Sequence, residues 1–163
     1  MQHILAFAVI ALIVAALAPR WLAPQQATPV VIATATPEAA SARTIAIARG
    51  ENGHFAIDAR VEGRRIGFLV DTGATTIALR EDDAARLGIH PALRDYTARI
   101  STANGSVMAA PVELNRVEIG DITVRNVTAI VLPDAALSQN LLGMSFLSRV
   151  RWQYQGGKLV LEQ

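Results

Sequence analysis

The stretch "GFLVDTGATTIALREDDAARLGI", residues 67–89, places a lone carboxylate, Asp71, at the end of an apolar run. The segment Thr72-Gly73-Ala74 follows it directly. An aspartate flanked by apolar residues is costly to bury unless it is hydrogen-bonded, paired with another group or used in chemistry. The stretch therefore indicates either a structural aspartate in a tight turn or a functional one, and the rest of the chain has to distinguish them.

The composition points to a folded domain without an obvious charged partner. The chain has 163 residues, of which 52% are apolar and 18% are charged, so a packed core is expected and wholesale disorder is not. Its 15 Lys and Arg residues nearly balance its 14 Asp and Glu residues. We therefore expect no nucleic-acid partner.

The residues that usually hold metals are sparse. The chain has no cysteine, which excludes disulfides, thiolate nucleophiles and cysteine-based metal sites. Its three histidines, His3, His54 and His90, are scattered, and none belongs to an HExxH spacing. We therefore predict no metal site and no cofactor.

The N-terminal segment, residues 1–22, is expected to form a hydrophobic helix that anchors the chain to a membrane. Residues 4–18 are an uninterrupted apolar run of 15 residues, shorter than the roughly 20 that usually span a bilayer, but Trp21 and Leu22 can extend it at the interface. A cleaved signal peptide is the main alternative, since residues 16–18 have the small-x-small form, although no Lys or Arg precedes the run. A buried core helix is disfavoured because the segment is apolar on every face.

Residues 23–42, "APQQATPVVIATATPEAASA", are rich in Pro, Ala and Thr and contain no Lys or Arg. Such a composition is typical of an extended tether. Arg20 favours a cytoplasmic C-terminal side by the positive-inside tendency, whereas the absence of further basic residues before Arg43 permits translocation. The predicted organisation is an anchor or signal segment (1–22), a linker (23–42) and one domain (43–163).

The domain itself has the pattern of an all-β fold. Apolar residues alternate through residues 55–61, a turn follows at Gly63-Arg64, and the alternation resumes through residues 66–70, as expected of two paired strands. Further hairpins are predicted at Asn104-Gly105, Gly120-Asp121 and Gly156-Gly157. Many short strands with closely spaced turns imply a barrel-like or sandwich domain.

One short helix is predicted in this domain, over "EDDAARLG", residues 81–88. Acidic residues fill its first turn and Gly88 provides a stop signal. Near the C-terminus, Val150, Trp152 and Tyr154 alternate on one face of a strand, and we expect the two aromatic residues to serve core or edge packing and not a ligand site.

An Asp-Thr-Gly tripeptide alone is weak evidence, because it arises by chance in roughly one of thirty chains of this length. Its context is more specific. The segments "FLVDTGATT" (68–76) and "NLLGMSFL" (140–147) resemble the retropepsin-like aspartic proteases, a family of single-domain enzymes that includes the retroviral proteases. The chain looks closest to the membrane-anchored bacterial members, over about residues 45–163. The resemblance implies a closed β-barrel, the half-domain of an acid protease.

The resemblance assigns roles to the residues of the loop 71–74. Asp71 would be the catalytic aspartate. Thr72 would form a hydrogen bond across the active site to its counterpart and keep the loop rigid. Gly73 would bring the backbone close to the carboxylate and the substrate, and Ala74 would complete the supporting loop.

Two other segments receive roles by resemblance. Asn104 and Gly105 would form the tip of a flap that closes over bound peptide. Residues 141–143 would be the strand that threads behind the catalytic loop. Retroviral proteases usually carry an arginine after that glycine, in a buried ion pair, and Met144 replaces it here. We therefore expect this ion pair to be absent and the dimer contacts that it supports to be rearranged.

Peptide hydrolysis by this route requires two carboxylates that share one proton. The chain has one Asp-Thr-Gly, and a domain of about 120 residues is too short for two lobes. A homodimer with the site on its twofold axis is therefore predicted. The substrate would be a polypeptide, hydrolysed through a water activated by the aspartate pair. Apolar substrate pockets are expected from the residues Phe68, Val70, Ile77, Met108 and Leu141.

Two other functions remain open at this stage. The chain could be a catalytically silent module of the same fold that binds peptides or assembles partners at a membrane. It could also be a structural β-barrel domain of an envelope complex in which the motif is accidental. The intact Asp71-Thr72-Gly73 favours the protease. The bacterial resemblance favours a single-pass location in the inner membrane with the domain on the periplasmic side, which is opposite to the side that Arg20 favours.

Overall fold

The computed structural model describes residues 43–102 and 105–163. The predicted N-terminal helix and linker lie outside the described residues, as does Asn104 at the predicted flap tip. In the part of the chain that is described, no helix has the length and apolar character needed to cross a bilayer.

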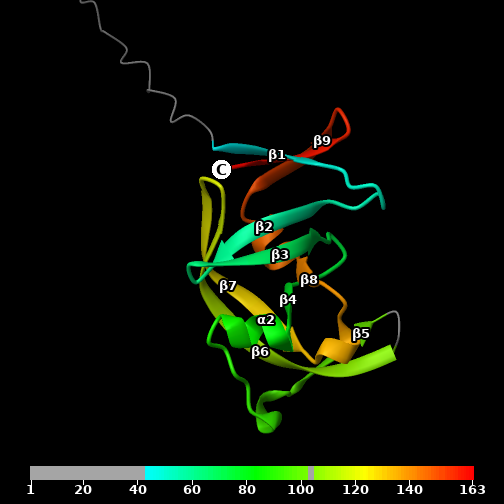
Figure 1. Ribbon diagram of the computed structural model, residues 1–163, viewed down its shortest axis with the longest axis vertical. Coiled ribbons are helices and arrows are strands. Elements are labelled where there is room, and N and C mark those ends of the chain that lie inside the picture. The colour runs from blue at the N-terminus through cyan, green and yellow to red at the C-terminus, as the bar shows by residue number, and fades with distance from the viewer. Residues whose placement is uncertain (1–42, 103–104) are drawn as a thin grey trace, which may run out of the picture. The chain divides into compact units, whose positions relative to one another are not determined.

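The described part is an all-β domain with a few short helices (Figure 1). Its strands are β1 (Thr44–Ala48), β2 (Ala56–Val61), β3 (Arg64–Val70), β4 (Ile77–Arg80), β5 (Ala98–Thr102), β6 (Gly105–Ile119), β7 (Ile122–Leu132), β8 (Asn140–Leu142), β9 (Arg151–Gln155) and β10 (Lys158–Glu162). The helical elements are α2 (Glu81–Arg86), α3 (Met144–Leu147) and the 3₁₀ turns η2 (Leu93–Asp95) and η3 (Asp134–Ala136).

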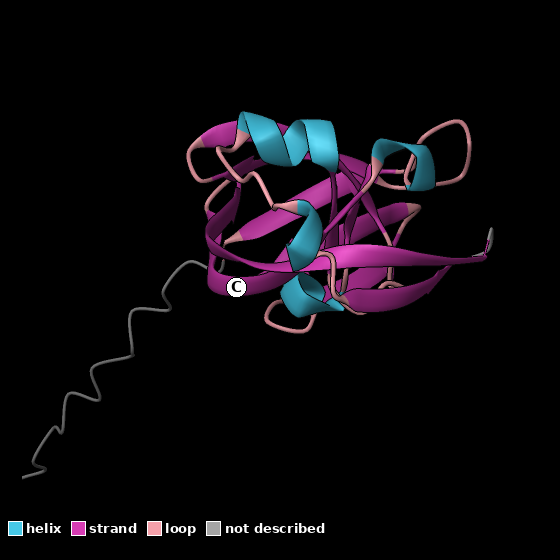
Figure 2. Cartoon of the chain, turned by 90° about the horizontal axis from the view of Figure 1, so that it is seen from below, coloured by secondary structure: helices cyan, strands magenta, loops and turns pink. Residues whose placement is uncertain are grey.

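Six strands close into a barrel in the order β2-β3-β8-β4-β7-β6, and the pairing of β2 with β6 joins the ends. Strand β5 extends this sheet as the partner of β6. Two neighbouring pairs are parallel, β3 with β8 and β4 with β7. Figure 2 shows that strands make up most of the domain and that its helices are short. The all-β barrel that the strand pattern predicted is therefore confirmed.

A separate antiparallel sheet, in the order β1-β10-β9, covers one end of the barrel (Figure 1). Its Ile47, Leu159 and Leu161 are buried and join the main core. The register pairs Leu161 with Trp152 and Leu159 with Tyr154, so the two aromatic residues share the inner face. They lie on the edge strand and stay exposed, although Tyr154 contacts Phe55 edge-on with ring centroids 6.1 Å apart. Edge packing, and not core packing, describes them.

The predicted hairpin turns at Gly63, Gly120 and Gly156-Gly157 are confirmed by the pairing of β2 with β3, β6 with β7 and β9 with β10. The β9–β10 turn has glycine at both of its central positions. Gly156 and Gly157 have φ values of 56° and 78°, a left-handed pair that matches the twist of the strands and that residues with a side chain rarely adopt.

The interior of the barrel is filled by inward-facing apolar side chains. The largest of those that are fully buried include Phe146, Ile66, Leu79, Leu114 and Ile119. Each such side chain stabilises the fold by about 1.5–3 kcal/mol relative to exposure. A smaller cluster around Ala78, Ala109 and Leu132 is separate from this core, and the candidate site lies over it, as described below.

The β6–β7 hairpin carries a bend that breaks the alternation of its side chains. Val117 and Leu114 on β6 are both buried, as are Val124 and Val127 on β7, so two residues instead of one separate the inward positions on each strand. Asn126 has a φ of 52°, a left-handed conformation that asparagine tolerates better than most residues. The pairs Asn115/Arg116 and Arg125/Asn126 consequently lie outside the barrel.

The prediction of one short helix was incomplete. Helix α2 forms over Glu81–Arg86, within the predicted range, but Met144–Leu147 forms a second one. It begins directly after Gly143 because its single turn buries Phe146 and Leu147 in the core. A four-residue helix is too short to show a periodic pattern, so tertiary packing decides it.

The segment after α2 is fastened back to that helix. The Tyr96 hydroxyl donates a hydrogen bond to Glu81 Oε1 at 3.0 Å. Burial raises the pKa of Tyr96 to about 12, and the hydrogen bond and the charge of Glu81 add to this effect. The contact holds the segment 89–97, which leads into β5, close to α2. It thus fixes the end of the β5–β6 hairpin at which β5 begins.

Candidate active site

Asp71 follows β3 on the loop that leads to β4, and the loop itself orients its carboxylate. The backbone N–H of Gly73 donates to Asp71 Oδ1 at 2.8 Å, and the N–H of Ala74 donates to the Asp71 carbonyl oxygen at 3.3 Å. A Cβ on Gly73 would lie 3.2 Å from Asp71 Oδ1, closer than most such contacts allow. Glycine at this position thus lets the backbone approach the carboxylate.

Strand β8 lies directly behind this loop. It pairs in parallel with β3, Leu141 opposite Leu69 and Leu142 opposite Val70, and the Asp71 N–H donates to the Leu142 carbonyl oxygen at 3.1 Å. The threading segment that the resemblance placed at residues 141–143 therefore touches the loop. This hydrogen bond fixes the position of Asp71 relative to the end of β3.

The start of α3 clamps the other side of the loop. The N–H groups of Met144 and Ser145 donate to the carbonyl oxygens of Ala74 (2.8 Å) and Thr75 (3.0 Å). Ser145 Oγ in turn accepts a hydrogen bond from the Ile77 N–H at 2.9 Å. Sequence reasoning missed Ser145, because a serine next to an apolar segment carries no sign of its distant partner.

Gly143 has no room for a side chain. A Cβ there would lie 2.2 Å from the Thr76 carbonyl oxygen and 2.7 Å from that of Ala74. Both are backbone atoms of the clamped loop, so neither can move aside cheaply.

We expect Gly143→Ala to lower the free energy of unfolding by about 3 kcal/mol, measured by urea denaturation. Gly67→Ala is the matched control, since its Cβ would meet only Asp58 Oδ1 at 3.6 Å. Equal stability of the two variants would contradict the close packing of loop and strand.

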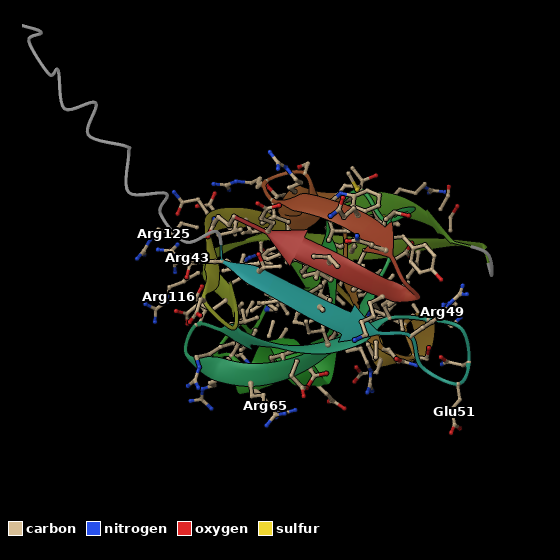
Figure 3. The ribbon with its side chains drawn as sticks, turned by 90° about the horizontal axis from the view of Figure 1, so that it is seen from above. Arg43, Arg49, Glu51, Arg65, Arg116 and Arg125 are labelled. Carbon is tan, nitrogen blue, oxygen red and sulfur yellow. The ribbon has the colours of Figure 1, made fainter. Side chains whose placement is uncertain are left out.

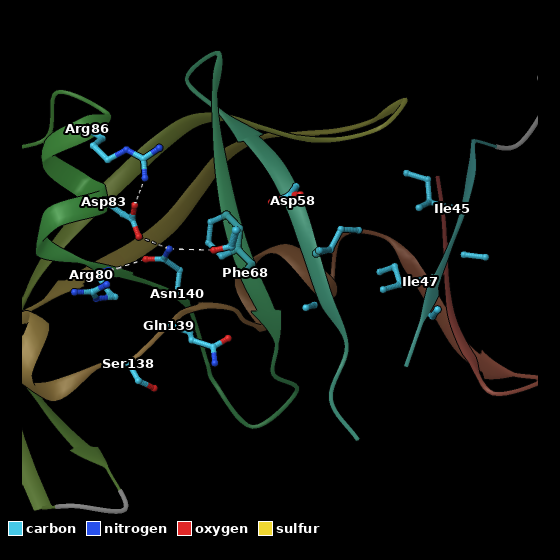
Figure 4. Close-up of a pocket in the computed structure, with 15 residues that line it drawn as sticks. Ile45, Ile47, Asp58, Phe68, Arg80, Asp83, Arg86, Ser138, Gln139 and Asn140 are labelled. Atoms are coloured by element: carbon cyan, nitrogen blue, oxygen red, sulfur yellow. Dashed lines mark hydrogen bonds and ion pairs between the residues drawn. The ribbon is translucent and has the colours of Figure 1, made fainter. Parts of the chain in front are cut away.

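Asn140, at the start of β8, is a buried polar residue that ties four elements together (Figure 4). Its Oδ1 accepts a hydrogen bond from the Arg80 N–H at 2.8 Å. Its Nδ2 donates to the Gly67 carbonyl oxygen (3.0 Å) and to Asp83 Oδ2 (2.7 Å). Asp83 also forms an ion pair with Arg86 at 2.7 Å. Because buried polar groups must be satisfied, this network fixes β8 relative to β3, β4 and α2.

A cavity of about 350 Å³ opens at Asp71. Its lining comes from the loop, from β4, β5, β7 and β8, and from the η3 turn, and comprises Asp71, Gly73, Ala74, Thr75, Thr76, Ala78, Ile100, Ser101, Ile130, Leu132, Ala136, Leu137 and Leu141. Among these described residues Asp71 is the one with an ionisable side chain. The cavity can therefore present a single carboxylate to a ligand whose other contacts are mostly apolar.

The prediction of which residues form apolar substrate pockets was mostly wrong, because four of the five do not line this cavity. Leu141 lines the cavity, but Phe68 and Ile77 are buried in the main core, and Val70 packs against it. Met108 is 40% exposed and lies outside the cavity lining. The error has a simple cause: side chains alternate along a strand, and proximity in sequence to Asp71 does not indicate which face a residue takes.

The β5–β6 hairpin contributes to the same cavity. Its register pairs Thr102 with Gly105, and Gly105 has a φ of 114°. Ile100 and Ser101 on β5 line the cavity. The hairpin predicted as a flap thus borders the site of Asp71. Asn104 lies outside the described residues, and Thr72 is exposed next to the cavity.

A larger cavity, of about 670 Å³, lies elsewhere and includes the Asn140 network (Figure 4). Both carboxylates that line it form ion pairs, Asp58 with Arg65 at 2.6 Å and Asp83 with Arg86 at 2.7 Å. Asp71 does not line it. The smaller cavity is the better candidate for chemistry because its carboxylate forms no ion pair with a described residue.

Comparison with known proteins agrees with the motif and the fold. Residues 57–149 match the family described as gag-polyprotein putative aspartyl protease. The crystal structure of a retropepsin-like aspartic protease from Rickettsia conorii superposes with a TM-score of 0.65 at 42% identity, covering 74% of this chain and 91% of that one.

Two curated bacterial proteins are also similar. One, from a Sinorhizobium species, is described as an uncharacterized protein in the cobV 5′ region and is 50% identical over 97 residues, 60% of this chain and 42% of its own. The other, an uncharacterized protein of Rickettsia prowazekii, is 45% identical over 107 residues, 66% of this chain and 46% of its own. The chain thus spans less than half the length of these relatives. Together the family match, the structural likeness and the Asp-Thr-Gly loop show that the chain belongs to the retropepsin-like aspartic proteases.

Proposed function

We propose that the chain is an aspartic endopeptidase whose catalytic residue is Asp71 and whose active site is completed by a second copy of the chain. One observation carries the proposal: the Asp71 carboxylate is oriented by its own loop and faces a cavity with no other ionisable side chain among the described lining residues. Family membership supplies the reaction class. The missing second carboxylate is what a symmetric partner would supply.

The reaction needs the two carboxylates to be close enough to share one proton, because both cannot be ionised at once in contact. The ionised carboxylate takes a proton from a bound water, whose oxygen attacks the peptide carbonyl carbon. The protonated carboxyl donates its proton to the carbonyl oxygen. The first carboxyl then gives the proton that it took from water to the leaving nitrogen as the C–N bond breaks. The second carboxylate takes a proton back from a hydroxyl of the tetrahedral intermediate, which restores the starting state of the pair. Gly73, Thr72 and Ala74 would keep each carboxylate in place during these transfers.

The substrate side chain next to the cleaved bond is expected to be apolar. Ala78, Ile130, Leu132, Leu137 and Leu141 all line the cavity beside Asp71, and burial of apolar surface would bind such a side chain. A charged side chain would find no opposite charge there except the catalytic carboxylate itself. We therefore propose cleavage within apolar stretches of polypeptide.

The β5–β6 hairpin is proposed to act as the flap. Gly105→Val places a β-branched residue at a φ of 114°, where it is strained, and should stiffen or distort the tip. We expect kcat to fall by about tenfold or more while the chain stays folded, because lid closure excludes water and completes the site.

Gly63→Val is the matched control for this variant. Gly63 also has a positive φ, 82°, and open space around it, but it lies in the β2–β3 turn. It should lose stability comparably and keep its turnover. Normal cleavage by Gly105→Val, or equal loss of turnover in both variants, would show that the hairpin is not a flap.

We further propose that residues 1–22 anchor the protease in the bacterial inner membrane and that residues 23–42 tether the domain to it, on the periplasmic side. The apolar run and a linker without Lys or Arg support this organisation. Protease protection of spheroplasts and vesicles would locate the domain, since it is cleaved only on the accessible side.

The direct test of the function is cleavage of a mixed peptide library by the purified chain in an uncharged detergent, with products identified by mass spectrometry. Hydrolysis at apolar sites is the expected result. A silent binding module would instead retain peptides without cleaving any, including at acidic pH and high enzyme concentration, and that outcome would contradict the proposal.

A further inference from the structure

A cleft of about 510 Å³ lies away from Asp71, between the start of β1, the first part of β7 and the segment before β9. Three of its six lining residues are arginines, Arg43, Arg125 and Arg149, and the others are Thr123, Val124 and Gln163. Figure 3 shows Arg43 and Arg125 at the same end of the domain. No carboxylate side chain is among the described residues that line the cleft.

Of the thirteen arginines in residues 43–163, six have a described carboxylate partner and seven do not. The three cleft arginines belong to the second group, together with Arg49, Arg60, Arg64 and Arg99. Arg65, Arg80, Arg86, Arg94, Arg116 and Arg151 each pair with an Asp or Glu. Arg43, Arg125 and Arg149 form no ion pair with any described carboxylate. Three positive charges around one hollow concentrate potential there, since the low-dielectric walls of a cleft focus the field.

Hydrogen bonds hold two of the three arginine side chains of the cleft in place. Arg149 Nη1 donates to the carbonyl oxygens of Arg125 (2.6 Å) and Asn126 (3.1 Å). The left-handed Asn126 lies at the bend of β7 described above. This contact fixes the guanidinium and leaves its other N–H groups free of any hydrogen bond to the described residues.

The opposite wall is fixed by Gln163. Its side-chain amide donates to the Thr123 carbonyl oxygen (2.8 Å) and accepts from the Thr123 N–H (3.0 Å). Arg43 Nη1 donates to the same Gln163 Oε1 at 3.4 Å. Two of the three cations are therefore held by neutral groups, which preserve their full charge.

The neighbouring strand β6 brings another arginine next to Arg125. The register of the β6–β7 hairpin puts Arg116 directly opposite Arg125, and like charges in that relation destabilise a sheet. Glu118 offsets Arg116, at 3.5 Å, but no described carboxylate offsets Arg125. An arrangement that costs stability in the free protein would be relieved by a bound anion.

We propose that this cleft binds a phosphate group. The planar guanidinium fork matches the oxygens of phosphate and can bind them in pairs, and three cations suit a group of one or two negative charges better than a single carboxylate. The cleft begins at Arg43, directly after the predicted linker, so the phosphate could be a lipid headgroup or part of a soluble compound. The site does not depend on Asp71.

The test uses the full chain in an uncharged detergent at low ionic strength, titrated with inorganic phosphate and followed by calorimetry. We expect saturable binding, and a dissociation constant raised about tenfold in Arg125→Gln, which removes one charge-assisted contact. Arg94→Gln removes the same charge from the exposed η2 turn and should bind as the wild type does. Asp71→Asn should also bind normally.

Acetate and dihexanoylphosphatidylglycerol complete the design. Acetate should compete poorly. Competition by the short-chain lipid assigns the site to a headgroup, whereas phosphate binding without such competition assigns it to soluble phosphate compounds, and either result supports the proposal. Absence of saturable binding up to about 10 mM phosphate, an equal loss in Arg94→Gln, or equal binding of acetate would overturn it.

Discussion

Asp71→Asn is expected to lower the rate of peptide hydrolysis by about 10³-fold or more while leaving the fold and the proposed dimer intact. The amide is nearly isosteric with the carboxylate, and its oxygen can still accept the hydrogen bond from the Gly73 N–H that Asp71 Oδ1 accepts at 2.8 Å. It cannot take a proton from water. In the proposed dimer the substitution removes both members of the carboxylate pair, so neither a base nor an acid is left.

The measurement is the initial rate on a peptide identified in the library screen, with far-UV circular dichroism and thermal unfolding recorded on the same samples. Asp121→Asn is the matched control: it makes the same chemical change in the exposed β6–β7 turn and should leave the rate unchanged. Undiminished turnover of Asp71→Asn, in a preparation free of other proteases, would exclude Asp71 as the catalytic group.

Local signals in the sequence predicted much of this fold. The alternation around Gly63 and the glycines at 120, 156 and 157 define hairpins because a turn with positive φ and two alternating strands are short-range features. The segments that carry the resemblance, 68–76 and 140–147, proved to be neighbours in space, since β3 and β8 pair in parallel. The candidate carboxylate and the strand behind it could therefore both be located from the amino-acid sequence alone.

Features that depend on distant partners could not be predicted. Asn140 looks like an ordinary polar residue before a short strand, and its partners Gly67 and Asp83 are 73 and 57 residues away. The closure of the barrel by β2 and β6 rests on pairs such as Val61 with Val117, which leave no local trace. The short helix α3 has the same origin.

The lining of the cavity was the hardest feature to predict from the sequence. Which side of a strand faces it depends on register, and a shift of one residue reverses every side chain. The bend at Asn126 adds a second difficulty, because there side chains no longer alternate between the inner and outer faces of β6 and β7. The arginine cleft depends on this bend, and the nearly balanced net charge of the chain gave no hint of it.

The activity of the soluble fragment 43–163 is expected to depend steeply on its concentration, because in the proposed mechanism each chain brings one catalytic carboxylate and the reaction needs two. Below the dimer dissociation constant, each tenfold dilution should lower the activity per chain by about tenfold. A series over three decades would then span about 10³-fold. The full chain should lose less activity if the proposed anchor and its linker of about 20 residues tether it in one bilayer, since confinement raises the effective concentration.

A mixing experiment separates this explanation from loss of protein at low concentration. When wild type is held fixed and exchanged with a threefold excess of Asp71→Asn, about one quarter of the wild-type chains should pair with each other. Mixed dimers hold one carboxylate, so they should be nearly inactive and the total activity should fall to about one quarter. Asp121→Asn added in the same excess should not lower it. Activity that stays proportional to the wild-type chains alone would mean that each subunit works by itself. A single carboxylate in an apolar cavity would then have to suffice, and the paired-aspartate mechanism would have to be given up even though the family and fold remain.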